Sequence, residues 1–284
     1  MQSNHIPTPI KIGPVEFDFS RTYIVGILNC TPDSFSDGGR YLDPELASKH
    51  ALRMIAEGAD IIDIGGESTR PGAEPISLDE ELNRVLPVIE KIRAKSDIPV
   101  SIDTYKSDVA KAAVKRGANL INDISGLRFD SKMASTAASF GLPVVVMHIK
   151  GEPRSMQKNP CYENLINEIK SYLKESIQIA ETGGIKREKI IIDPGIGFGK
   201  TFQHNFSILR NLDRFSDIGQ PILVGASRKG FLGSLSGSDL DDRIEESLAA
   251  SVIAASNGAH FVRVHDVAPT VRALKVCDAV SHAD

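Results

Sequence analysis

Short apolar runs recur along the chain from residue 22 onward, each followed by a polar or glycine-rich break and a segment with helical spacing. Runs of this length, apolar at nearly every position, are typical of strands buried on both faces of a parallel sheet. They predict strands over 22–28, 59–65, 98–103, 118–123, 142–148, 189–193, 221–226 and 259–264. Eight strands alternating with helices predict an α/β fold, the (β/α)8 TIM barrel.

The segments between these strands carry helix signals. A helix is predicted after Pro44 and ends at Gly58, and Ser77 with Glu80 has the spacing of a capping box that opens the next helix. Further helices are predicted over 109–114, 163–181 and 244–257. We also expect a short hairpin over 10–18, so that residues 1–20 form an N-terminal extension and residues 21–284 a single barrel domain.

An open doubly wound sheet would also alternate strands and helices. Eight units without a change of composition favour closure into a barrel instead. No G-x-G-x-x-G sequence follows the first strand, which excludes the dinucleotide-binding version of the open sheet.

Composition narrows the class of protein. The 284 residues are 41% hydrophobic and 25% charged, ordinary values for a soluble globular protein. The net charge of −4 gives no electrostatic case for nucleic acid or an anionic membrane, and no apolar run approaches the roughly 20 residues that span a bilayer. Residues 1–13 lack the features of a signal peptide, and three cysteines show no metal-like spacing or pairing, so a cytoplasmic location is expected.

Residues 190–201, IIIDPGIGFGKT, join a buried strand to a glycine-rich loop. A carboxylate at such a junction, here Asp193, is poorly solvated and needs a specific partner. The final GKT imitates a phosphate-binding loop, but that motif requires glycine where this chain has Pro194. We therefore expect a rigid loop that holds Asp193 and Lys200 over a small ligand.

Polar side chains stand at the carboxyl ends of the predicted strands, where the active sites of barrels lie. In chain order they are Asn29; Asp63 with Glu67, Thr69 and Arg70; Asp103; Asn122 with Asp123; His148; Asp193; Ser227 with Arg228 and Lys229; and Arg263 with His265. One such residue could simply cap a loop. Polar groups at all eight ends predict one polar pocket.

The charges in this set predict a ligand with two different ends. The cations suit a phosphate or pyrophosphate group. They are Arg70, Arg228, Lys229 and Arg263, with His265 beside them. Asp103, Asp193 and Asn122 suit an N–H-rich heterocycle, because carboxylates accept parallel N–H bonds. A divalent metal beside a pyrophosphate would be held mostly by the phosphates and by one Asn or Asp.

Two loops rich in glycine and proline follow the first two strands, over 29–41 and 65–75. The first carries Phe35, and the second places Arg70 next to Pro71. Such loops serve as lids in many barrels, and ordinary surface loops have the same composition, so both interpretations stay open.

Phrases spread in order over nearly the whole chain resemble those of the dihydropteroate synthases. They are GILNCTPDSFSDGG (26–39), DIGGESTRPGA (63–73), SIDTYK (101–106), INDISG (121–126), MHIKGEPRSMQ (147–157), DPGIGFGK (193–200), GASRKGFLG (225–233) and VRVHDV (262–267). The resemblance implies a barrel that joins dihydropterin pyrophosphate to p-aminobenzoate. The products would be 7,8-dihydropteroate and pyrophosphate, in a step of folate biosynthesis that uses Mg²⁺. It also implies a homodimer.

The resemblance further implies roles by motif position. The pterin-binding residues would be Asp103, Asn122, Met147, Asp193, Phe198 and Lys229. Pyrophosphate would contact Asn29, Arg70, Arg263 and His265, with Asn29 as the metal ligand. The p-aminobenzoate pocket and loops would use Phe35, Thr69, Arg70, Pro71, Ser227 and Lys229. The catalytic group would be Asp103, Asp193, Lys229, Arg263 and His265.

Loss of pyrophosphate from the pterin methylene carbon would leave a cation delocalised into the ring, which predicts an SN1-like transfer without a covalent enzyme intermediate. Three other functions are alternatives. A pterin-binding methyltransferase domain acting on a corrinoid partner has no use for the STRPG loop and the SRK motif. A catalytically idle homologue would lack Arg70, Lys229 or His265, and all three are present. A phosphosugar isomerase or aldolase would need Lys229 as its base or Schiff-base lysine.

Overall fold

The computed structural model describes residues 7–31, 43–70, 72–239, 242–281 and 283. Within these ranges one sheet of parallel strands has the order β8-β7-β6-β5-β4-β3-β10-β9. Its strands are β3 (Tyr23–Asn29), β4 (Ile61–Gly65), β5 (Val100–Asp103), β6 (Leu120–Asp123), β7 (Val144–Met147), β8 (Ile190–Asp193), β9 (Leu223–Val224) and β10 (Phe261–Val264). A parallel bridge between Ile192 and Ile222 joins the two edges. The predicted TIM barrel is therefore confirmed.

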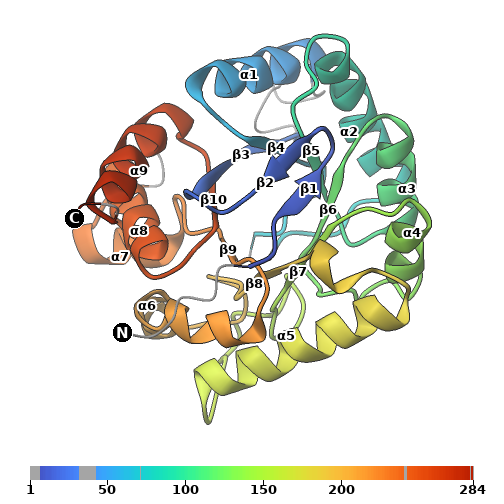
Figure 1. The fold of residues 1–284 in the computed structure, drawn as a ribbon. Coiled ribbons are helices and arrows are strands. Elements are labelled where there is room, and N and C mark those ends of the chain that lie inside the picture. Colours follow the sequence, from blue (N-terminus) through green and yellow to red (C-terminus); the bar gives the residue numbers. More distant parts are fainter. Residues whose placement is uncertain (1–6, 32–42, 71, 240–241, 282, 284) are drawn as a thin grey trace.

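Helices surround the barrel (Figure 1). They are α1 (Pro44–Glu57), α2 (Leu78–Arg93), α3 (Ser107–Lys115), α4 (Met133–Ser139), α5 (Leu165–Thr182), α6 (Phe202–Arg210), α7 (Gly230–Ser236), α8 (Ile244–Ser256) and α9 (Val267–Ser281), with 3₁₀ turns η1 (Arg187–Lys189) and η2 (Leu212–Ile218). Ser77 caps α2 by accepting a hydrogen bond from the Glu80 amide. The predicted capping box is not closed, because the Glu80 carboxylate pairs with Arg84 instead.

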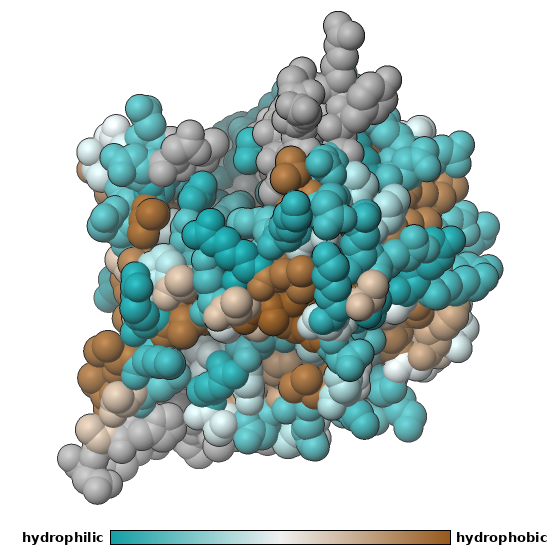
Figure 2. Space-filling model, turned by 90° about the horizontal axis from the view of Figure 1, so that it is seen from above, coloured by the Kyte–Doolittle hydropathy of each residue, from teal (hydrophilic) through white to brown (hydrophobic). Residues whose placement is uncertain are grey.

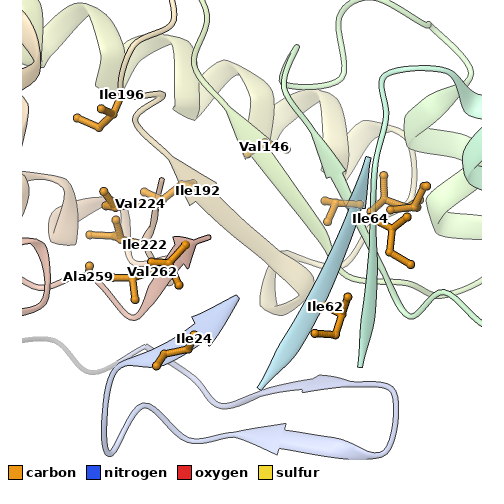
Figure 3. Packing of buried hydrophobic residues seen from close by; sticks show 14 of the residues in the cluster. Ile24, Ile62, Ile64, Val146, Ile192, Ile196, Ile222, Val224, Ala259 and Val262 are labelled. Atoms are coloured by element: carbon orange, nitrogen blue, oxygen red, sulfur yellow. The ribbon is translucent and has the colours of Figure 1, made fainter. Parts of the chain in front are cut away.

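Outward-facing strand residues form the main apolar core. Ile24, Ile62, Val146, Ile192 and Val262 are all buried, and they belong to a cluster that the surrounding helices complete (Figure 3). By contrast, the outer face seen in Figure 2 is largely hydrophilic, with apolar side chains in small groups between polar ones. The helices therefore present their apolar sides to the barrel wall.

A two-stranded hairpin closes the amino-terminal end of the barrel. It consists of β1 (Ile10–Ile12) and β2 (Val15–Phe17), which pair antiparallel as expected. Phe17 is fully buried, and its ring meets that of Tyr23 edge-on at a centroid distance of 4.8 Å. Ile10 and Ile12 belong to the same small core. Inward-facing residues near the amino-terminal ends of the barrel strands complete this core. The division of the chain at residue 20 remains a prediction.

The inward face of the barrel changes from apolar to polar along several strands. Side chains of a strand alternate between its two faces, so residues two apart share a face. In four strands an apolar residue of the small core under the hairpin is followed two positions later by a polar residue. These pairs are Ile61 and Asp63, Leu120 and Asn122, Ile191 and Asp193, and Phe261 and Arg263. The polar residues of these pairs form a layer at the carboxyl end of the barrel.

Candidate active site

The centre of the polar layer is an arginine held by two carboxylates. Arg263 of β10 donates from Nε to Asp63 Oδ2 at 2.6 Å and from Nη2 to Asp103 Oδ2 at 2.8 Å. Asn122 also donates to Asp63 Oδ2, at 3.2 Å. Residues from β4, β5, β6 and β10 are thus joined by charge-assisted and amide hydrogen bonds. The structure brings together the predicted Asp103, Asn122 and Arg263.

Burial and neighbouring charges set the protonation of this group. Burial raises the pKa of Asp103 to about 7, with Arg263 opposing the shift and Asp63 adding to it. For Arg263, burial disfavours the charged form, but Asp63 and Asp103 more than offset it and raise its pKa. The guanidinium therefore stays charged, while Asp103 titrates near neutrality.

The glycine-rich loop after β8 is shaped to turn over Asp193. Asp193 Oδ1 accepts a hydrogen bond from the Gly195 amide at 2.7 Å. Gly195 has a φ of +70°, and a Cβ added there would lie 1.9 Å from the carbonyl oxygen of His148. Only glycine meets both demands. On the neighbouring strand β7, the buried Met147 lies directly opposite Asp193 in the sheet register.

Lys229 reaches this loop from the other side of the barrel end. Its ammonium donates to the carbonyl of Ile196 and lies 4.7 Å from the centre of the Phe198 ring. Burial lowers the pKa of Lys229 to about 8, against the opposing effect of Asp193. The predicted pterin-set residues Asp193, Phe198 and Lys229 therefore meet around one loop.

Lys200 does not face the ligand side, contrary to expectation. It is buried, and its Nζ lies 2.9 Å from His148 Nδ1 and donates to the Phe198 carbonyl at 2.9 Å. Burial lowers its pKa well below the usual value, and burial together with the Lys200 charge lowers that of His148 to about 2. Both side chains support the loop from inside.

Two further predicted pocket residues are bound by neighbouring protein groups. Asp123 is fully buried and accepts hydrogen bonds from the amide and hydroxyl of Ser125, so it caps the loop after β6. Arg228 has a φ of +57° and forms a two-pronged ion pair with Asp266. The prediction that all eight strand ends supply one pocket was therefore wrong for His148 and Asp123, whereas the charge of Arg228 still acts on His265.

The ends of β9 and β10 meet through a serine and a histidine. Ser227 Oγ lies 3.1 Å from His265 Nδ1 and accepts from the His265 amide at 3.2 Å. Burial, then the charges of Arg263 and Arg228, lower the pKa of His265 to about 3, and Arg70 adds a smaller effect in the same direction. The exposed Arg70 of the β4–α2 loop thus acts electrostatically on His265.

The remaining predicted residues divide between described and undescribed parts of the chain. Asn29 ends β3, half-buried and level with Gly65 in the register, and Thr69 lies in the β4–α2 loop. Phe35 and Pro71 lie outside the described residues.

Asn29 suits a magnesium ion bound chiefly by a substrate. Among the described residues no group of three or more His, Cys, Asp or Glu side chains could hold a metal. An amide oxygen at the barrel end is a hard ligand, and Mg²⁺ commonly takes one or two protein oxygens while phosphates and water fill its other positions. The amide of Asn29 therefore fits an ion that phosphates hold.

Comparisons with known proteins match this geometry. The sequence model of the pterin binding enzyme family matches residues 25–265. The dihydropteroate synthase of Clostridium beijerinckii is 50% identical over 273 residues, which cover 95% of this chain and 99% of the relative. That of Escherichia coli K12 is 47% identical over 94% of each chain. The chain belongs to the dihydropteroate synthase family.

Solved structures agree with this assignment. A Xanthomonas albilineans dihydropteroate synthase with 4-aminobenzoic acid superposes with a TM-score of 0.92 at 43% identity, covering 98% of this chain and all of that one. The same organism's enzyme in complex with 7,8-dihydropteroate gives a TM-score of 0.87 at 40% identity, covering 97% of this chain and all of that one. A Yersinia pestis family member in a sulfonamide drug complex gives 0.93 at 42% identity, with the same coverages.

No described helix is both long enough and apolar enough to cross a membrane.

The raised pKa of Asp103 predicts a pH dependence of stability. The ordinary value is 3.8 and the folded value about 7, so between them the folded chain holds a proton that the unfolded chain has lost. The contribution of Asp103 to stability is therefore largest at low pH and falls as pH rises toward 7. Urea denaturation at about pH 4.5 and about pH 7.5 should show a larger loss of stability in the wild type than in Asp103→Asn. Equal losses would contradict a raised pKa.

Proposed function

We propose that this chain condenses dihydropterin pyrophosphate with 4-aminobenzoate to give 7,8-dihydropteroate and pyrophosphate, by dissociative loss of pyrophosphate. Membership of the dihydropteroate synthase family supports the reaction. The observation that supports the site is the polar layer at the carboxyl end of the barrel, in which the Arg263 guanidinium is paired with Asp63 and Asp103.

The pterin ring would bind between the glycine loop and β6. Asp193 on β8 and Asn122 on β6 offer hydrogen-bonding oxygens on either side of β7, and Met147 of β7 would supply an apolar wall. Lys229 would donate to a ring acceptor from its place beside the Phe198 ring. A carboxylate accepting parallel N–H bonds fixes a guanidine-like edge in one orientation.

The pyrophosphate would lie toward β10 and β3. Its negative charge would be faced by Arg263, Arg70 and His265. Asn29 and Ser227 would lie at the edge of this pyrophosphate site. His265 is neutral in the ligand-free site because of burial and nearby cations. A bound polyanion would raise its pKa and favour the charged form.

Bond breaking would be favoured by charges already in place. As the methylene–oxygen bond breaks, positive charge develops on the pterin and negative charge on the leaving group. An ionised Asp103 would stabilise the first charge and Arg263 the second, and both effects would be larger in the transition state than in the bound substrate. Mg²⁺ held by the phosphates and Asn29 would supply additional neutralisation of the leaving group.

The β4–α2 loop would place the arylamine. Thr69 and Arg70 lie on this loop, and Ser227 and Lys229 follow β9. With Phe35 and Pro71, they would position 4-aminobenzoate so that its nitrogen attacks the methylene carbon.

Product formation tests the proposal directly. Pyrophosphate release from dihydropterin pyrophosphate should require Mg²⁺, and dihydropteroate should form only when 4-aminobenzoate is present. In Asp193→Asn the rate of product formation should fall about a hundredfold, because the carboxylate that contacts the pterin ring is replaced by a neutral amide. Tight pterin binding without release in the wild type would point to an idle homologue, and a wild type that does not bind pterin would sink the proposal.

We also infer a cytoplasmic homodimer. The free cysteines Cys30, Cys161 and Cys277 agree with a reducing compartment. Val276 and Val280 lie one turn apart on α9 and are 65% and 70% exposed, and Ile253 on the adjoining α8 is 47% exposed. Apolar side chains gathered on packed helices are typical of an interface between copies.

Sedimentation should therefore give the mass of two chains for the wild type. The double variant Val276→Glu/Val280→Glu should shift the protein toward one chain, because burying two carboxylates without partners disfavours association. Val15→Glu, on the exposed side of the hairpin strand β2, is the matched control and should remain dimeric. A wild type that sediments as a single chain would contradict the inference.

A further inference from the structure

The SIDTYK segment contains two residues that the proposed reaction does not use, Tyr105 and Lys106. They lie two and three residues after Asp103, and Lys106 directly precedes the first residue of α3. Both side chains reach sideways to the β4–α2 loop, residues 66–77. This loop carries Thr69 and Arg70.

The ammonium of Lys106 joins the two ends of that loop. Its Nζ donates to Glu67 Oε2 at 2.5 Å, near the start of the loop, and to the carbonyl of Ile76 at 2.8 Å, near its end. A third bond, at 2.7 Å, goes to Glu81 Oε2 on α2. An ammonium has three N–H donors, so this set uses all of them.

A second donor fixes the Glu67 carboxylate. Tyr105 Oη donates to Glu67 Oε1 at 2.5 Å, so the two oxygens of Glu67 are held by two consecutive residues. The side chain of Glu67 is 8% exposed and that of Glu81 is 1% exposed, compared with 20% for Lys106. Hydrogen bonds to buried charges are stronger than those at a surface, and losing one partner leaves the other unsatisfied.

The start of the loop is also fitted closely to α2. Arg84 donates to the carbonyl of Gly66 at 2.7 Å. A Cβ added at Gly66 would lie 2.8 Å from a methyl carbon of Val85. The loop therefore leaves the barrel along one path, and its two ends are set by the β5–α3 connection and by α2.

We propose that Tyr105, Lys106, Glu67 and Glu81 form a clamp that positions the β4–α2 loop for binding of 4-aminobenzoate. These are positioning residues, which act through Thr69 and Arg70. The inference rests on the proposed function for the identity of the substrate. Because Lys106 lies three residues after Asp103, the clamp ties the arylamine loop to the strand that serves the pterin.

Steady-state kinetics with each substrate varied in turn tests the clamp. Lys106→Met should raise KM for 4-aminobenzoate about tenfold, while KM for dihydropterin pyrophosphate changes less than about twofold. Glu67→Gln and Tyr105→Phe should also raise the ratio of KM for 4-aminobenzoate to KM for dihydropterin pyrophosphate, with the smallest effect from Tyr105→Phe. Lys111→Met, at an exposed position on α3, is the matched control and should leave both KM values unchanged.

A general loss of structure would raise both KM values together or lower kcat alone, and that result would overturn the clamp. Should Lys106→Met not fold, the ratio is measured in Tyr105→Phe, which removes a single hydroxyl. An unchanged ratio there and in Glu67→Gln would overturn the clamp equally.

Hydrogen exchange separates the clamp from the reaction. Amides over residues 66–77 should exchange faster in Lys106→Met than in the wild type or in Lys111→Met, with the barrel strands unaffected. If the wild type forms no dihydropteroate, the proposed function is wrong but the clamp is not contradicted. Hydrogen exchange over residues 66–77 would then test the clamp. Unchanged exchange over residues 66–77 would overturn it.

Discussion

The interaction on which the rest of the site depends is the buried ion triad of Asp63, Arg263 and Asp103. A charge inside a barrel is costly unless it is paired and hydrogen-bonded, so neither carboxylate nor the guanidinium is stable there alone. Together they link β4, β5 and β10 at the level where the apolar interior ends. In the proposed reaction Asp103 would face the pterin ring and Arg263 the pyrophosphate.

Backbone constraints complete this division. The loop after β8 needs glycine at position 195, because the His148 carbonyl occupies the space where a Cβ would lie. Lys200 and His148 hold the loop from inside, and Lys229 reaches it from the β9 side. Asp193 is therefore fixed by backbone geometry, whereas the β4–α2 loop is held by Tyr105 and Lys106, which follow β5. The two substrates would be positioned by different means on one scaffold.

The sequence predicts the barrel well because buried parallel strands leave a strong local signal, and each of the eight predicted runs contains a strand. It predicts less about where a polar side chain points. Asn122 and Met147 face inward, so the alternation of side chains along a strand turns Asp123 and His148 outward, and this alternation can be read from the sequence. Arg228 and Lys200 could not be assigned in this way, because loop geometry and the distant partners Asp266 and His148 decide their directions. The same holds for the pairing of Asp63 with Arg263, which lies 200 residues along the chain. Helices α4, α6, α7 and α9 were not predicted. Two of them, α4 and α7, have only seven residues each, and α9 buries the polar Thr270 beside Cys277 and Leu274.

The central claim is that pyrophosphate leaves before the arylamine attacks, in a site whose charges are already in place. The most direct test uses dihydropterin pyrophosphate with a heavy oxygen isotope in the bridge between the methylene carbon and phosphorus. This substrate is incubated with enzyme and Mg²⁺, without 4-aminobenzoate. If the bond breaks first, rotation and return of the pyrophosphate should move the label to non-bridging positions, which phosphorus NMR detects. A label that stays in the bridge, in an enzyme that turns over once 4-aminobenzoate is added, would give no sign of bond breaking before the arylamine binds and would contradict the account.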